Sequence, residues 1–168
     1  MKKFFAFDNA EPLLMFIDQH KDRIMGQHIR HFCSSAAFGE MAETPLAFEL
    51  DDYSIVISYY HLSSVDLYLV DTPSLKNDLS LNFLHRENPE SRNLREWISE
   101  EKFPYIGQAI KDIRIDRFSH EFEINPSTGE TRPDGDDYFS KITVVLSSGQ
   151  EFNICAADTF CDGYIEIR

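Results

Sequence analysis

Hydrophobic residues in this chain recur mostly with the two-residue period of β-strands, and a helical period is clear in two segments. The first segment lies between Asn9, whose side chain suits a helix cap, and Gly26, which suits a helix end. This spacing predicts a first helix between those two residues. The residues on its apolar side are Leu13, Phe16, Ile17, His20 and Ile24.

A second helix is predicted from about residue 89 to residue 102. Asn88 supplies a capping side chain, Pro89 suits the first helical position, and Glu90 places an acid in the first turn. Apolar residues follow at positions 94, 97 and 98, and a Phe-Pro pair at 103–104 ends the pattern.

Strand patterns fill the segment between these two helices. From Ile29 the pattern is strand-like, and across residues 46–51 apolar and more polar positions alternate, as in a sheet with one wet face. Asp51 and Asp52 then form a turn. Two runs rich in β-branched and aromatic residues follow, Tyr53–Tyr60 and Val65–Val70. Together these segments predict a β-meander.

The C-terminal half also predicts antiparallel strands. Apolar residues alternate through 110–124, and residues 125–137 read as a long polar loop. Residues 142–146 and 152–156 flank the turn Ser147–Gln150, which is a strong hairpin signal, and Tyr164–Ile167 forms a last strand. We therefore predict one α+β domain over residues 1–168, with an antiparallel sheet, built from the meander and the C-terminal hairpin, and two main helices.

Charge sets limits on the partners of such a domain. The net charge is −13, with −7 over residues 32–82 and −7 over residues 118–168, while residues 83–117 are balanced. Nucleic acid is an unfavourable partner because phosphate binding depends on Lys and Arg, whereas a basic protein is favoured. The apolar runs are too short for a spanning helix or a secretory signal, so we expect a cytoplasmic protein without membrane contact.

The chemistry-bearing residues form no convincing catalytic or metal site. Three cysteines, Cys33, Cys155 and Cys161, make an odd, sparse set, which indicates free thiols. In the cluster His28-x-x-His31-x-Cys33, a strand turns His28 away from the other two residues. Glycine-rich phosphate loops and nucleophile elbows are absent from the sequence. We expect no enzyme activity, no metal and no cofactor.

The meander carries the best candidate for a binding surface. Acidic and tyrosine residues occur there together without Lys or Arg, and both residue types suit an interface with an arginine-rich partner. The second acidic block adds three aspartates from the polar loop, which lack the spaced ligands of a calcium site. The candidate partner-binding residues are Glu49, Asp51, Asp52, Tyr53, Tyr59, Tyr60, Asp66, Tyr68, Asp71, Asp134, Asp136 and Asp137.

Residues 103–168 resemble immunity proteins of bacterial contact-dependent growth inhibition. The resemblance lies in Ile106-Gly107-Gln108-Ala109-Ile110, the hairpin sequence LSSGQEFNI and the terminal DGYIEIR. It implies a small, acidic, cytosolic, non-enzymatic protein that neutralises a cognate toxin domain, often a basic nuclease, by occluding its active or substrate-binding surface. Such proteins share no signature residues, so the resemblance assigns no role to a particular residue.

Two other functions fit the sequence. One is a small-molecule-binding domain or enzyme whose site is assembled from distant residues, around His31, Cys33 or His120. A deep pocket lined by these groups would favour it. The other is a subunit of a larger cytosolic assembly, which an exposed apolar patch would favour.

Overall fold

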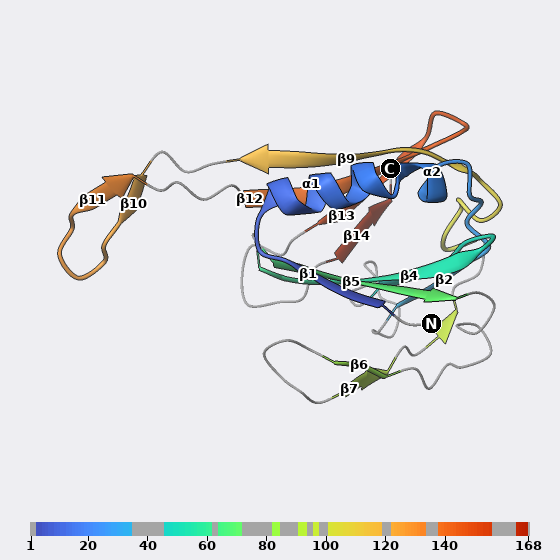
Figure 1. Cartoon of the computed structure of the whole chain (residues 1–168), viewed down its shortest axis with the longest axis horizontal. Helices are drawn as coiled ribbons and strands as arrows, with labels where there is room; N and C mark the ends of the chain where they lie inside the picture. The colour runs from blue at the N-terminus through green and yellow to red at the C-terminus, as the bar shows by residue number, and fades with distance from the viewer. Residues whose placement is uncertain are drawn as a thin grey trace.

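The chain forms an α+β structure of antiparallel sheets and two helices, as its residue pattern predicts (Figure 1). The computed structural model describes residues 3–34, 46–61, 64–71, 82–84, 91–93, 96–97, 101–118, 122–133, 138–155 and 164–167. In Figure 1 the two larger sheets lie one above the other, with their strands running across the view.

The first sheet contains the predicted meander at its centre and has six strands in the described part of the chain. Every neighbouring pair is antiparallel, and the hairpin of β4 and β5 begins with Tyr53 opposite Asp71. In spatial order the strands are β1 (Lys3–Phe7), β5 (Ser64–Asp71), β4 (Tyr53–His61), β3 (Leu46–Glu49), β2 (His31–Ser34) and β8 (Glu96–Trp97).

The second sheet contains the predicted C-terminal hairpin. Its turn includes Gly149 at φ 88°, a left-handed conformation that glycine adopts without steric cost. The predicted last strand also forms and pairs with β13. In spatial order the strands are β14 (Tyr164–Ile167), β13 (Glu151–Cys155), β12 (Tyr138–Leu146) and β9 (Ile110–Phe118).

The predicted first helix is present as two consecutive helices, α1 (Ala10–Gln19) and α2 (Lys21–Ile24), separated at His20. Asn9 precedes α1 in an extended conformation, but its side chain makes no capping hydrogen bond. α1 runs along one side of the two sheets, between β9 and β1 (Figure 1). An ion pair between Arg117 and Glu11, 3.1 Å apart, connects β9 to α1. Neither helix of the described chain has the length and apolar character needed to cross a bilayer.

Aromatic side chains join the two sheets in one core. Phe48 of the first sheet stacks on Phe152 of the second, with ring centroids 5.6 Å apart. Phe103 is fully buried and stacks on Phe32 at 4.4 Å while meeting Phe152 edge-on at 5.4 Å. Tyr105 stacks on the other side of this group, 5.6 Å from Phe152. The segment around residue 103 is therefore part of the core.

The predicted second helix is wrong for the described residues within it. Residues 91–93 form the strand β7 (Ser91–Asn93), which pairs with β6 (Asn82–Leu84), and Glu96–Trp97 forms β8. In β8, Trp97 pairs with Cys33 and Glu96 with Ser34. This pairing supplies hydrogen-bond partners to the outer edge of β2, and such long-range pairing overrides a local helix preference.

The expected wet face of residues 46–51 is also wrong. Ala47 and Glu49 are buried, as are Leu46 and Phe48 on the other side of β3. The strand therefore has both faces covered, and Figure 1 shows β6 and β7 on the side of the first sheet away from α1. Within the predicted polar loop, Thr131–Pro133 forms a strand, β11, paired with β10 (Phe122–Ile124).

Candidate functional site

A row of polar residues crosses three strands on the outer face of the first sheet, the face away from the core. The strand register places His31 opposite Glu49, and Glu49 opposite Ser54. His31 Nε2 lies 3.9 Å from Glu49 Oε1, and the Glu49 side chain is 8% exposed. The two side chains form an ion pair when the imidazole is protonated.

This row does not have the order of a catalytic triad. In a triad the histidine lies between the nucleophile and the acid, so that it can take the proton of the nucleophile. Here Glu49 lies between His31 and Ser54 in the strand register. Ser54 Oγ is buried, without a hydrogen bond to any residue that the structure describes. The arrangement supports an ion pair between strands and gives no base for Ser54.

Three further chemistry-bearing residues of the two sheets are inaccessible. Cys33 and Asp66 are both fully buried, and Cys155 is buried in β13. A buried thiol is shielded from reactants in solution. In the described ranges, no group of His, Cys, Asp and Glu residues is placed to hold a metal ion. His120 and Cys161 lie outside the described residues.

A second polar cluster lies at the turn between β3 and β4. Asp51 Oδ2 accepts hydrogen bonds from the backbone N–H and from Nδ1–H of His28, both at 2.8 Å. Arg30 donates to the other oxygen of Asp51 from Nε at 2.6 Å. Asp52 exchanges two hydrogen bonds with the side chain of Gln27, at 2.7 and 3.0 Å. The two aspartates thus fix this turn to residues 27–30.

Two groups at this turn have shifted pKa values. The backbone N–H of His28, with smaller contributions from its side chain and from Arg30, lowers the pKa of Asp51 to about 2. Burial raises the pKa of Tyr53 to about 12, despite the opposing charge of Arg23. The Tyr53 hydroxyl donates to the backbone carbonyl of Arg23, which ties β4 to α2.

The predicted acidic surface of the meander does not form as one exposed face. Glu49 and Asp66 are buried on the outer face of the first sheet, where an approaching protein does not meet them. Asp51 and Asp52 are exposed, but their carboxylates already bind residues 27–30. The side chains of Tyr59, Tyr60, Tyr68 and Asp71, and the whole of Asp134, Asp136 and Asp137, lie outside what the structure describes.

The segment of residues 118–137, named here the acidic arm, connects β9 to β12 in the sequence. It carries six acidic residues and one basic residue, Arg132, so its net charge is −5. Its described hairpin of β10 and β11 projects from the rest of the molecule in Figure 1. Ile124 is 65% exposed, and residues 125–130 of the turn are all exposed. The arm adds no described side chain to the buried core.

An apolar cavity of about 60 Å³ lies between the two sheets and α1, and only apolar side chains line it. Leu13 and Phe16 of α1, Ile57 and Leu67 of the first sheet, and Val144 and Phe152 of the second sheet are among its lining residues. The polar residues His31, Cys33 and Ser54 are not among them. The cavity therefore offers shape and apolar contact, without an acid, a base or a nucleophile.

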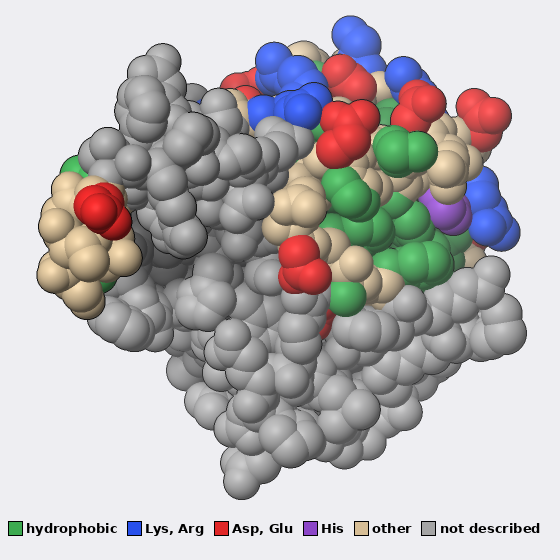
Figure 2. All heavy atoms as spheres, turned by 60° about the vertical axis from the view of Figure 1, so that its left-hand side comes forward, with side chains coloured by type: hydrophobic (Ala, Val, Ile, Leu, Met, Phe, Trp, Pro, Cys, Tyr) green, Lys and Arg blue, Asp and Glu red, His purple; other side chains and the backbone are tan. Residues whose placement is uncertain are grey.

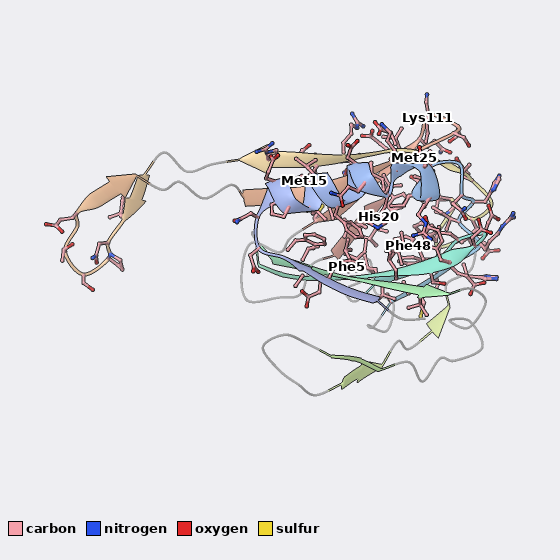
Figure 3. The ribbon with its side chains drawn as sticks, in the orientation of Figure 1. Phe5, Met15, His20, Met25, Phe48 and Lys111 are labelled. Atoms are coloured by element: carbon pink, nitrogen blue, oxygen red, sulfur yellow. The ribbon has the colours of Figure 1, made fainter. Side chains whose placement is uncertain are left out.

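The cavity reaches the surface beside α1. Four of its lining residues keep part of their exposure, and they are Ile17, Ile55, Leu69 and Ile113. In Figure 2 hydrophobic side chains gather on this side of the molecule, next to a histidine and below a mixture of acidic and basic groups. Figure 3 shows His20 on the side of α1 that faces β1 and Phe5. Its ring stacks on Phe16 at 4.2 Å.

Sequence reasoning missed this cavity, although a signal for it was present. Ile55 and Ile57 on β4 and Leu67 and Leu69 on β5 form opposed pairs, Ile55 with Leu69 and Ile57 with Leu67. A run of strands with so few charged residues is typical of a sheet buried on both faces. Comparison of the chain with protein-family models, with curated proteins and with solved structures finds no match.

Proposed function

We propose that this chain is a binding protein that docks onto a basic partner protein through its acidic arm. The observation that carries the proposal is the projecting hairpin with its exposed Ile124, which lies within a segment, residues 118–137, whose net charge is −5. A hairpin that leaves the core gains little folding energy from burial, and an exposed large apolar residue on it suits contact with another molecule.

The two chemical features of the arm have different roles in this proposal. The acidic residues attract the basic partner over several ångströms and raise the association rate, an effect that salt weakens. Ile124 is buried only in the complex and contributes apolar contact there. In the complex, the carboxylates occupy the positions at which the partner binds the phosphates of its substrate. The mechanism is therefore occlusion of the partner's substrate-binding surface.

We further propose that the partner is a toxin domain and that the chain is its immunity protein, as the resemblance of residues 103–168 implies. The net charge of −13 supports a basic nuclease as the toxin class. The polar residues described above do not form an accessible catalytic group, which agrees with an inhibitor more than with an enzyme.

Co-expression with a neighbouring gene product tests the toxin assignment. The probe is the protein encoded immediately upstream of this chain, produced alone and together with it. We expect the upstream protein to stop growth and this chain to restore it, with direct binding in calorimetry that weakens as salt rises. A harmless upstream protein, or a toxic one that this chain neither binds nor neutralises, overturns the assignment.

Matched substitutions test the arm. Glu123→Lys with Glu130→Lys reverses two charges on the arm, and we expect association to slow about tenfold. The control is Asp18→Lys with Asp22→Lys, the same charge change on the helices, which we expect to have a much smaller effect. Ile124→Ser is expected to speed dissociation, whereas Met15→Ser, at the exposed Met15 of α1, is not. Equal effects of arm and control substitutions contradict the proposal.

A further inference from the structure

We propose that the cavity between the two sheets binds the alkyl group of a small uncharged molecule, which enters beside α1. This inference does not rest on the acidic arm, because the cavity and the arm share no residue. The first reason is chemical. The lining is wholly apolar, so a water molecule inside finds no hydrogen-bond partner, and such cavities stay dry or bind apolar molecules.

The size of the cavity limits what it holds. At about 60 Å³ it is less than half the size of an apolar cavity of roughly 150 Å³ that holds one benzene molecule. A narrow alkyl chain suits a space of that size, and the rest of a longer chain continues into the mouth. A bulky ring does not fit without displacement of α1.

The mouth favours a ligand without net charge. Beside Ile55 of β4 and Leu69 of β5, the mouth is bordered by α1, α2 and β9, which carry five acidic and five basic residues. The acidic residues are Glu11, Asp18, Asp22, Asp112 and Asp116, and the basic residues are Lys21, Arg23, Lys111, Arg114 and Arg117. This balance contrasts with the net charge of the chain. A charged ligand therefore gains no net attraction at this mouth to offset the loss of its hydration, whereas an uncharged molecule loses little hydration.

α1 forms one wall of the cavity and can adjust to a ligand. Leu13, Phe16 and Ile17 of this helix line the cavity, while its opposite side faces solvent. The end of the helix region is fixed by the bond from Tyr53 to the Arg23 carbonyl. His20 donates from Nδ1 to the Phe16 carbonyl at 2.8 Å, which fixes its ring against α1.

Binding of a homologous series measures the proposal directly. The probes are straight-chain alcohols from 1-propanol to 1-octanol, and the readout is the chemical shift of the methyl groups of Ile57 and Val144. We expect saturable shifts, with affinity rising about fourfold for each added methylene until the cavity and mouth are filled. Absence of saturable shifts at these methyl groups overturns the proposal.

The entry route is tested by comparing a Trp substitution at the mouth of the cavity with one on the solvent side of α1. Ile17→Trp places a large ring at the entrance, and we expect octanol to bind about tenfold more weakly, the equivalent of nearly two methylenes lost from the cavity. Met15→Trp puts the same ring on the solvent side of α1 and is expected to bind like the parent protein. Equal binding by both variants overturns the entry route.

A second variant protects the test against failure of Ile17→Trp to fold. Val144→Ile adds one methylene to the cavity wall, and we expect roughly fourfold weaker octanol binding. The acidic arm reversal described above is expected to leave alcohol binding unchanged, so the two proposals fail separately. Binding to phosphatidylcholine vesicles is measured as well, because membrane lipids also carry alkyl chains. Capture by vesicles without alcohol binding contradicts a site for a small molecule.

Discussion

The carboxylate of Asp51 accepts two hydrogen bonds from a single residue, His28, one from its backbone and one from its ring. This pair joins the turn between β3 and β4 to the segment that precedes β2, 23 residues earlier in the chain. An acid that sequence reasoning assigned to partner binding therefore has a structural role of its own.

Protonation of Asp51 is expected to destabilise the fold in a defined pH range. Its pKa is lowered to about 2 in the folded chain, from an ordinary value of 3.8, so its contribution is present above pH 3.8 and is lost as the pH falls toward 2. We expect Asp51→Asn to lower the free energy of unfolding by about 1 kcal/mol at neutral pH, a modest value because the group is partly exposed. Chemical unfolding at pH 7 and near pH 2 measures the difference, which should shrink in acid.

Asp52→Asn is the control for that experiment. Its carboxylate accepts one hydrogen bond from a neutral side chain, Nε2 of Gln27, while its backbone N–H donates to Gln27 Oε1. We expect it to show a smaller change at neutral pH. The same pH dependence in both variants would show that general surface charge, and not the His28 contact, is responsible.

Tyr53 is expected to titrate later than an exposed tyrosine. Burial raises its pKa to about 12 from 10.0, so the stability linked to its neutral form is present below pH 10 and is lost as the pH rises through 12. The ultraviolet absorbance change near 295 nm in alkali, roughly two pH units above the ordinary tyrosine midpoint, should be missing in Tyr53→Phe. If the parent protein and this variant titrate identically above pH 11, the buried environment of Tyr53 is wrong.

The local parts of this fold were predictable, and the parts set by distant pairing were not. The hairpin of β12 and β13 follows from its own turn, where Gly149 adopts a positive φ, and the first helix follows from its own period. β8 depends on the pairing of Trp97 with Cys33, which no local pattern contains. The capping signal at residues 88–90 is local, so it predicted a helix where the distant pairing forms a strand.

Burial of the acidic residues was the part of the candidate site that sequence could not give. Glu49 and Asp66 fit the alternation of a sheet with one face exposed to solvent. The pattern therefore assigns them to one face of the sheet but does not predict whether other segments bury that face. Coverage depends on which other segments pack on that face. Partner binding by the acidic arm stays a prediction, because its aspartates at positions 134, 136 and 137 lie outside the described residues.

Charge reversal at Asp66 is expected to disturb folding more than recognition. Asp66 is fully buried, and Asp66→Lys leaves an uncompensated charge inside the protein at a cost of roughly 3–5 kcal/mol. Circular dichroism and chemical unfolding should show the loss before any partner is added. A stable, well-folded Asp66→Lys variant would mean that the outer face of the first sheet is open to water.

Truncation of Phe103 is expected to loosen both sheets at once. Its ring is fully buried and contacts Phe32, Phe152 and Tyr105, which come from both sheets and from its own loop. Phe103→Ala removes these contacts and should lower the free energy of unfolding by about 3–5 kcal/mol. Phe103→Leu keeps most of the volume and should cost less. A change below about 1 kcal/mol for the alanine variant would contradict a shared core, because a ring that joins two sheets cannot be removed without a cavity between them.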